Sequence, residues 1–226
     1  MAIIKSEPLY LQIYRTIEDS IMNGELESGE RIIDSKIAQE FGVSRGPVRE
    51  AMRKLEQDGL VINKSGEMYI YSPTVSDVVE LYQLRISLEP LAVFGATKNI
   101  KEAGLIELEN ILKETENAIN SSNKDEVVKL NTLFHEKIIA VCGKSRLQLI
   151  LGNIRSLTNI CRNTIIKKST RSNTFLTEHW EIYHGMKKGD SEAASKSMKK
   201  HLMNDLNIFI EMYDLELEEV NIMEKI

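Results

Sequence analysis

The chain has 226 residues, of which 42% are hydrophobic and 28% are charged, a composition that supports one large or two small packed domains. Only 4 prolines and 12 glycines leave little room for a turn-rich β fold, and a net charge of −5 argues against a protein that coats nucleic acid through bulk charge. The sequence shows no apolar run of membrane-spanning length and no secretory signal. Cys142 and Cys161 fit no metal or redox spacing. We therefore expect a mostly helical, cytoplasmic protein with reduced, buried thiols.

The first third of the sequence predicts short helices followed by a β-hairpin. The expected elements are helices over Pro8–Met22, Ser35–Phe41 and Ser44–Asp58, and strands over Leu60–Asn63 and Met68–Tyr71. Asp34 and Ser44 precede the second and third helices and are the expected N-caps, because their side chains can accept backbone N–H bonds. Gly66 favours a tight turn between the two strands.

The pattern changes at Pro73, because proline biases its predecessor to extended backbone and long helical periodicities follow. We therefore predict one domain over residues 1–73 and a second over residues 74–226. The expected helices of the second domain are Ser76–Thr97, Glu102–Ser121, Lys124–Val141, Ser145–Lys168, Asn173–Lys188 and Asp190 to about Tyr213. Their short connections predict an antiparallel all-α bundle of about six helices.

Three arginines form a stripe on the third predicted helix. Arg45, Arg49 and Arg53 recur every four residues, on a different face from the apolar residues of that helix. A guanidinium fork suits guanine or phosphate, and the hairpin behind the helix would be a wing with Lys64 and Gly66 at its tip. A solvated charged face is the alternative for the arginines alone. The capped helix, the turn before it, its arginine stripe and the hairpin behind it together predict a winged helix-turn-helix that contacts double-stranded DNA.

The same stretch resembles a known family. The segments IMNGELESGERI and SKIAQEFGVSRGPVREAMRKLEQDGLV make residues 8–72 similar to the winged helix of the GntR superfamily of bacterial transcriptional regulators. The resemblance implies that Arg45 and Arg49 contact bases or phosphates and that Arg31 supports a backbone contact. Gly46 departs from the usual threonine or serine, which puts one phosphate contact in doubt. The predicted DNA-contact residues are Arg31, Ser44, Arg45, Gly46, Arg49, Arg53, Lys64 and Gly66.

A second set of polar residues lies in the predicted bundle. Asn131 and His135 share one helix face, and His179 and His201 lie on consecutive helices that would meet if antiparallel. Three imidazoles and one oxygen would suit a divalent ion of the Zn²⁺ or Ni²⁺ type, with open positions for a small ligand. Spacing alone leaves open that these are separate surface or core histidines. His184 falls on a different part of its helix and is expected to be structural or solvent-facing.

Residues 76–213 resemble the all-helical FCD effector domain of the FadR branch. The matching segments are VVELYQLRISLEPLA, LNTLFHEKI and TEHWEIYHGMKKGDSEAASKSMKKHL. The resemblance implies a metal site in which the three histidine ligands fall on His135, His179 and His201, and the aspartate position holds Asn131. Asparagine offers only a neutral oxygen, so the site loses a negative charge and metal affinity. The rival interpretation is a polar cavity that binds its ligand without a metal.

Arg85 is the other residue expected at the ligand. Its simplest role is an ion pair with Glu89 at i+4. By resemblance to FCD domains it faces an effector cavity, where a guanidinium would pair with a carboxylate. Arg85 and Asn131 are therefore the predicted effector-binding residues, and a small organic or sugar acid is the expected effector.

These patterns lead to three functional hypotheses. The first is a homodimeric transcriptional regulator that binds a palindromic operator and responds to a small carboxylate-containing effector. The second is a metal sensor in which the ion itself is the signal. The third is a metal-dependent hydrolase, which is disfavoured because no general base accompanies the histidines and no HExxH motif is present. We therefore expect a regulator and not an enzyme.

Overall fold

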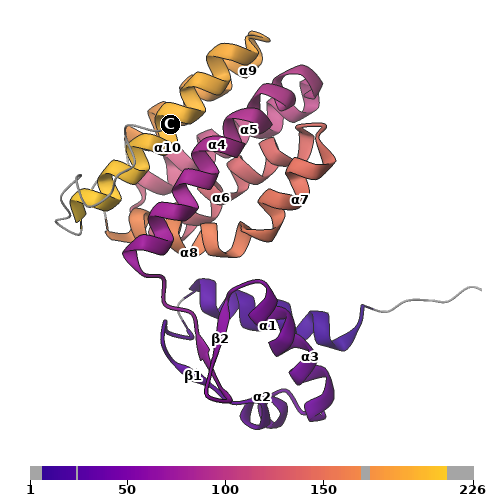
Figure 1. The fold of residues 1–226 in the computed structure, drawn as a ribbon. Coiled ribbons are helices and arrows are strands. Elements are labelled where there is room, and N and C mark those ends of the chain that lie inside the picture. Colours follow the sequence, from indigo (N-terminus) through magenta and orange to yellow (C-terminus); the bar gives the residue numbers. More distant parts are fainter. Residues whose placement is uncertain (1–6, 24, 169–173, 213–226) are drawn as a thin grey trace, which may run out of the picture. The chain divides into compact units, whose positions relative to one another are not determined.

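The computed structural model describes residues 7–23, 25–168 and 174–212 of a chain that divides into two compact units, residues 1–74 and 75–226. The described residues form ten helices and one three-stranded sheet, which confirms the mostly α class with a winged helix-turn-helix and a helical bundle (Figure 1). No helix among these residues is long and apolar enough to cross a membrane.

The first unit is a three-helix core with a small sheet. Its elements are α1 (Leu9–Asn23), β1 (Arg31–Ile32), α2 (Asp34–Glu40), α3 (Arg45–Gln57), β2 (Val61–Lys64) and β3 (Glu67–Ile70). Helix α3 packs against α1 and α2 and buries Val48, Ala51, Met52 and Leu55. These side chains share one helix face, so the opposite face, which carries the arginines, is left in solvent.

The hairpin of β2 and β3 has the predicted tight turn, and its strands extend to leave only two residues in the loop. Lys64 pairs with Glu67, and Ser65 and Gly66 between them have φ angles of 55° and 89°. Two successive positive φ angles match the right-handed twist of the flanking strands. The sheet has the antiparallel order β1-β3-β2, and the two-residue strand β1 was too short to give a period in the sequence.

The second unit is a bundle of seven helices within the described residues. They are α4 (Val75–Asn99), α5 (Glu102–Asn120), α6 (Lys124–Val141), α7 (Ser145–Asn153), α8 (Arg155–Lys168), α9 (Thr174–Lys187) and α10 (Ser191–Met212). Helix α4 is central, since it packs against α6, α7, α8, α9 and α10. One continuous apolar core runs through these helices. The polar residues that interrupt this core are therefore the ones that need an explanation.

The prediction of one helix over Ser145–Lys168 is wrong. The chain breaks at Ile154, where φ and ψ leave the helical region, and α8 starts at the next residue. No proline marks the break, whereas Pro90 lies inside α4 without ending it. Helix α7 packs mainly against α4 and α8 mainly against α6, and this tertiary packing overrides local propensity. The predicted helix start at Asn173 and end at Tyr213 fall outside the described residues.

A close helix contact gives a test of this packing. A Cβ atom added at Gly185 of α9 would lie 2.8 Å from the Ala194 backbone nitrogen of α10. We expect Gly185→Ala to lower the free energy of unfolding by about 1–3 kcal/mol, because the two helices must separate to accept the methyl group. Urea denaturation measures it. Gly152→Ala in α7, where the new Cβ meets nothing within 4 Å, is the matched control and should be neutral or slightly stabilising. Equal effects of the two substitutions would contradict this packing.

Candidate functional site

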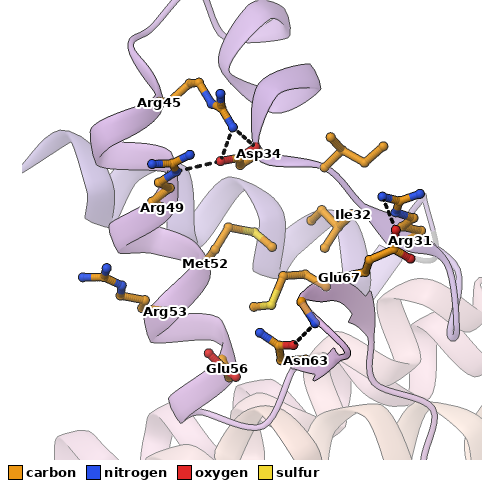
Figure 2. A pocket seen from close by; sticks show the side chains of 13 residues that line it. Arg31, Ile32, Asp34, Arg45, Arg49, Met52, Arg53, Glu56, Asn63 and Glu67 are labelled. Atoms are coloured by element: carbon orange, nitrogen blue, oxygen red, sulfur yellow. Dashed lines mark hydrogen bonds and ion pairs between the residues drawn. The ribbon is translucent and has the colours of Figure 1, made fainter.

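The arginine face of α3 borders a groove in the first unit. The groove has a volume of about 440 Å³ and lies between α3, β1 and the hairpin. Figure 2 shows Arg45, Arg49 and Arg53 along one side, with Arg31 and Glu67 across from them. The structure therefore brings together five predicted DNA contacts around one concavity, namely Arg31, Arg45, Arg49, Arg53 and Gly66.

Asp34 organises two of these arginines. Arg45 Nη2 donates to both Asp34 carboxylate oxygens at 2.9 and 3.0 Å, and Arg49 Nε donates to Oδ2 at 2.8 Å (Figure 2). Hydrogen bonds from Arg49 and then Arg45 hold the pKa of Asp34 below its ordinary value. The expectation that Asp34 caps α2 is wrong, because Ile33 is the N-cap and the carboxylate is turned to the arginines instead.

The other predicted contacts lie around the same face. Ser44 is the N-cap of α3, as predicted, but its hydroxyl makes no capping hydrogen bond. Arg31 pairs with Glu67 across the sheet, and Lys64 lies over the Tyr69 ring. A Cβ atom at Gly46 would meet nothing within 4 Å, so this position tolerates a side chain and no packing demand explains the glycine.

The three predicted histidines of the bundle do converge. His135 comes from α6, His179 from α9 and His201 from α10, and all three are buried. One nitrogen of each lies within 4.8 Å of the other two, and the Nε2 atoms of His179 and His201 are 3.3 Å apart. Two ligands bound at about 2.0–2.1 Å to a tetrahedral ion are also about 3.3 Å apart. The spacing therefore fits two ligands of one ion, and it also fits a hydrogen bond between the two imidazoles.

Two carboxylates orient these imidazoles. Glu89 Oε2 accepts from His135 Nδ1 at 2.6 Å, and Glu178 Oε2 accepts from His201 Nδ1 at 2.8 Å. Because each carboxylate accepts the Nδ1 proton, an uncharged imidazole in this position keeps its lone pair on Nε2. A carboxylate behind a histidine is the usual support of a metal ligand.

Two of the three imidazoles, those of His135 and His179, favour the uncharged form that a metal requires. Burial, followed by repulsion from Arg162, lowers the pKa of His135 to about 3. Burial and the two neighbouring imidazoles hold the pKa of His179 well below its ordinary value. His135 Nε2 and Asn131 Oδ1 are buried and have no hydrogen-bond partner among the described residues. The three imidazoles therefore fit a divalent ion, and Asn131, one turn before His135 on α6, keeps an unbonded oxygen that a ligand could use.

Arg85 lies beside this cluster and is fully buried. Its Nε donates to Glu89 Oε1 at 2.6 Å, and its guanidinium lies 4.6 Å from the Tyr82 ring centre. Burial alone would raise the pKa of Glu89, but Arg85 and His135 outweigh it and hold that pKa well below its usual range. Arg85 Nη1 and Nη2 are buried without a partner in the described part of the chain. The ion pair expected between Arg85 and Glu89 is therefore present, and the two unused donors leave the effector-binding role of Arg85 as a prediction.

The comparisons with known proteins decide the family. Residues 9–68 match the family described as bacterial regulatory proteins, gntR family, and residues 80–204 match the FCD domain. The chain belongs to the GntR family of bacterial transcriptional regulators. Its FCD domain places it in the FadR branch, and it is a regulator and not an enzyme.

Relatives of this GntR-family regulator span nearly its whole length. The HTH-type transcriptional regulator YdhC of Bacillus subtilis (strain 168) is 39% identical over 203 residues, covering 89% of this chain and 91% of that protein. The gluconate operon transcriptional repressor of the same strain is 28% identical over 167 residues, covering 72% and 69%. The solved structure of E. coli McbR/YncC has a TM-score of 0.80 at 19% identity, covering 92% of this chain and 100% of that one, and so shows the same fold.

Two buried residues beside the histidines were missed from the sequence. Arg162 of α8 reaches Thr132 and Asn159 at 3.3 Å, and its Nε has no partner among the described residues. Asp205 Oδ2 lies 3.6 Å from His201 Nε2, one turn along α10. Asp205 could have been predicted from the sequence, because it lies four residues after the candidate ligand His201. Arg162 had no such signal, because nothing in the sequence around it indicates that its side chain is buried. His184 is exposed and stacks on Trp180, which confirms its exclusion from the cluster.

The Arg85–Glu89 pair gives a stability test. We expect Arg85→Met to lower the free energy of unfolding by about 3–5 kcal/mol, because it leaves the buried Glu89 carboxylate without its cation. The double change Arg85→Met with Glu89→Gln should cost less than the sum of the single changes. Lys113→Met, which breaks an exposed i,i+4 pair with Glu109, is the control and should have a much smaller effect. Urea denaturation of metal-free protein decides this, and strict additivity would contradict the coupling.

Proposed function

We propose that this regulator binds a palindromic operator as a homodimer and that a small organic acid, held in the bundle with the help of a divalent ion, changes its affinity for DNA. The observation that carries the proposal is the buried cluster of His135, His179 and His201 beside the unused donors of Arg85. A packed core tolerates unpaired polar atoms only where something satisfies them, so a polar ligand is the expected occupant. The ligand would bias the placement of two DNA-binding units.

The groove of the first unit supports the DNA side of the proposal. The N-terminal half of α3 presents Arg45 and Arg49 to solvent, and the wing tip at Gly66 exposes its backbone. A helix N-terminus favours phosphate, and arginine forks suit guanine edges in the major groove. These features support α3 as the recognition helix and the hairpin as its wing.

An apolar stripe on α4 supports self-association. Leu84 and Leu91 are about half exposed and lie seven residues apart, with Leu88 between them. Leucines at this spacing on a helix suit a symmetric contact with a second copy, in which the same patch serves both chains. A dimer would also match a two-fold symmetric operator.

A bound ion would be held by the three imidazoles and the Asn131 oxygen. When bound, it supplies a Lewis acid that attracts one oxygen of a carboxylate. Glu89 and Glu178 keep the imidazoles oriented, while Arg85 offers two N–H groups to the rest of the anion. The effector class is supported by this chemistry, and gluconate, in the name of one relative's operon, is itself a sugar acid.

The DNA hypothesis is tested at α3. Arg49→Ala should weaken specific operator binding by about 1–3 kcal/mol if Arg49 contacts a base edge. Quantitative gel shifts on a selected palindromic duplex measure the loss, and sedimentation of the complex should give two chains per duplex. Arg146→Ala, at an exposed arginine of α7, is the control and should leave binding unchanged. Failure to select any sequence-specific duplex, with or without candidate acids, would contradict the proposed operator binding.

The metal hypothesis is tested by thermal stability. Excess Zn²⁺ or Ni²⁺ should raise the melting temperature of the chelator-treated protein, because an ion that binds only the folded state stabilises it by mass action. His179→Gln should abolish the shift, and His184→Gln, at the exposed histidine, should retain it. Identical shifts in both variants would show that the ion binds elsewhere. Operator affinity that follows free metal without any acid would instead favour the ion as the signal.

A further inference from the structure

One carboxylate joins the two helices that form the helix-turn-helix of the first unit. Asp34 is the first residue of α2, and Arg45 and Arg49 lie in the first two turns of α3. The carboxylate accepts two hydrogen bonds from Arg45 Nη2, at 2.9 and 3.0 Å, and one from Arg49 Nε, at 2.8 Å (Figure 2). Both of its oxygens are therefore engaged by arginines that line the groove.

These contacts leave much of each guanidinium group open to solvent. The side chains of Arg45 and Arg49 are 55% and 58% exposed, whereas that of Asp34 is 24% exposed. Arg49 donates through Nε, and in the described part of the chain it has no further hydrogen bond through Nη1 or Nη2. Paired N–H donors are what an arginine uses to read a guanine edge. The carboxylate therefore holds Arg49 without covering its two Nη groups.

Stability alone is a weak explanation for this arrangement. Exposed ion pairs contribute little to stability, because water and salt screen them and because long side chains lose freedom when they pair. Arg45 and Arg49 are also one helical turn apart, where like charges repel. A shared acceptor offsets this repulsion and fixes the direction of both side chains. Arg53, one turn farther along α3, has no hydrogen bond or ion pair among the described residues and provides a comparison.

We propose that Asp34 is a positioning residue for sequence reading, which orients Arg45 and Arg49 before DNA is bound. This rests on the operator binding by α3 proposed above. A side chain that is already ordered loses less freedom on binding, and it fits only the base edges that match its geometry. Contacts to phosphates carry no sequence information directly. Asp34 therefore raises the preference for the operator, while its negative charge lowers the attraction to DNA of any sequence.

The role of Asp34 is measured with the full chain and two duplexes at one fixed salt concentration. One duplex is the palindrome that the wild-type protein selects, and the other is a scrambled duplex of the same composition. Asp34→Asn keeps the shape of the side chain and removes its charge. We expect the ratio of the two affinities to fall by at least about fivefold, the loss expected for one bidentate base contact. Affinity for the scrambled duplex should stay equal or rise, because a negative charge is removed.

Further variants separate positioning from a simple effect of charge. Glu50→Gln removes an exposed acid of α3 that has no hydrogen bond or ion pair among the described residues, so both affinities should change by the same factor. Asp34→Glu retains the carboxylate and should keep more of the ratio than Asp34→Asn does. The effect of Asp34→Asn on the ratio should shrink in an Arg49→Ala background, because coupled residues are not additive. It should persist in an Arg53→Ala background.

A measurement on the wild-type chain does not depend on how the variants fold. In the DNA-free protein, NMR relaxation should show the Nε–H group of Arg49 ordered and that of Arg53 mobile on the ps–ns timescale. Equal mobility of the two groups would overturn the positioning role. If Asp34→Asn does not fold, as judged by circular dichroism, this comparison still decides.

The outcomes separate positioning by Asp34 from operator binding itself. An unchanged ratio in a folded Asp34→Asn variant overturns the positioning role and leaves operator binding standing. Both affinities would then rise together if the carboxylate merely competes with DNA for the arginines, and both would fall together if it merely holds α2 against α3. If the wild-type chain selects no duplex, operator binding and the positioning role are both overturned.

Discussion

The bundle site depends on the Glu89 carboxylate, which bonds two of the other residues of the site. One oxygen holds Arg85 on the same helix, and the other holds His135 on α6, with both partners buried. A buried carboxylate is tolerable only with such partners, and each partner is in turn oriented by it. The Arg85 guanidinium and the His135 imidazole, which we propose contact an anion and a metal ion, are thus positioned by one carboxylate. Because that group lies on the central helix α4, the site is built into the packing of the bundle and not attached to its surface.

Much of the fold could be predicted because the apolar periodicity and the turn residues of the sequence indicate the same elements. Helix α6 was predicted with the same ends that it has in the structure, and the turn at Gly66 was predicted from the glycine. What could not be predicted depends on tertiary packing. The break at Ile154 has no proline, and Pro90 leaves α4 intact, with its carbonyl accepting from Ser195 at 3.0 Å. Local propensity is a weak guide when several helices compete for one core.

The candidate site, like the fold, could be predicted only in part from the sequence. His135, His179 and His201 could be proposed together because resemblance supplied the connection that spacing did not. Their supporting carboxylates were ordinary glutamates in the sequence, and only the distances show which of them face an imidazole. Nothing in the sequence distinguishes Arg162 from the other arginines, and only the structure shows that its side chain on α8 is buried. Residues that act through burial carry no sequence signature of their own, because burial is a property of the whole fold.

The Asp34 contact has a consequence for how DNA binding depends on ionic strength. Arg45 and Arg49 carry two positive charges, but the carboxylate between them leaves this trio with a net charge of one. The salt dependence of binding reflects the counterions released from DNA, and that number follows the net charge brought to the phosphates. Helix α3, the proposed recognition helix, would therefore gain less long-range attraction to DNA than its arginines suggest. Asp34 fixes the positions of Arg45 and Arg49 before any DNA is bound, so we expect discrimination among sequences to depend more on geometry than on charge.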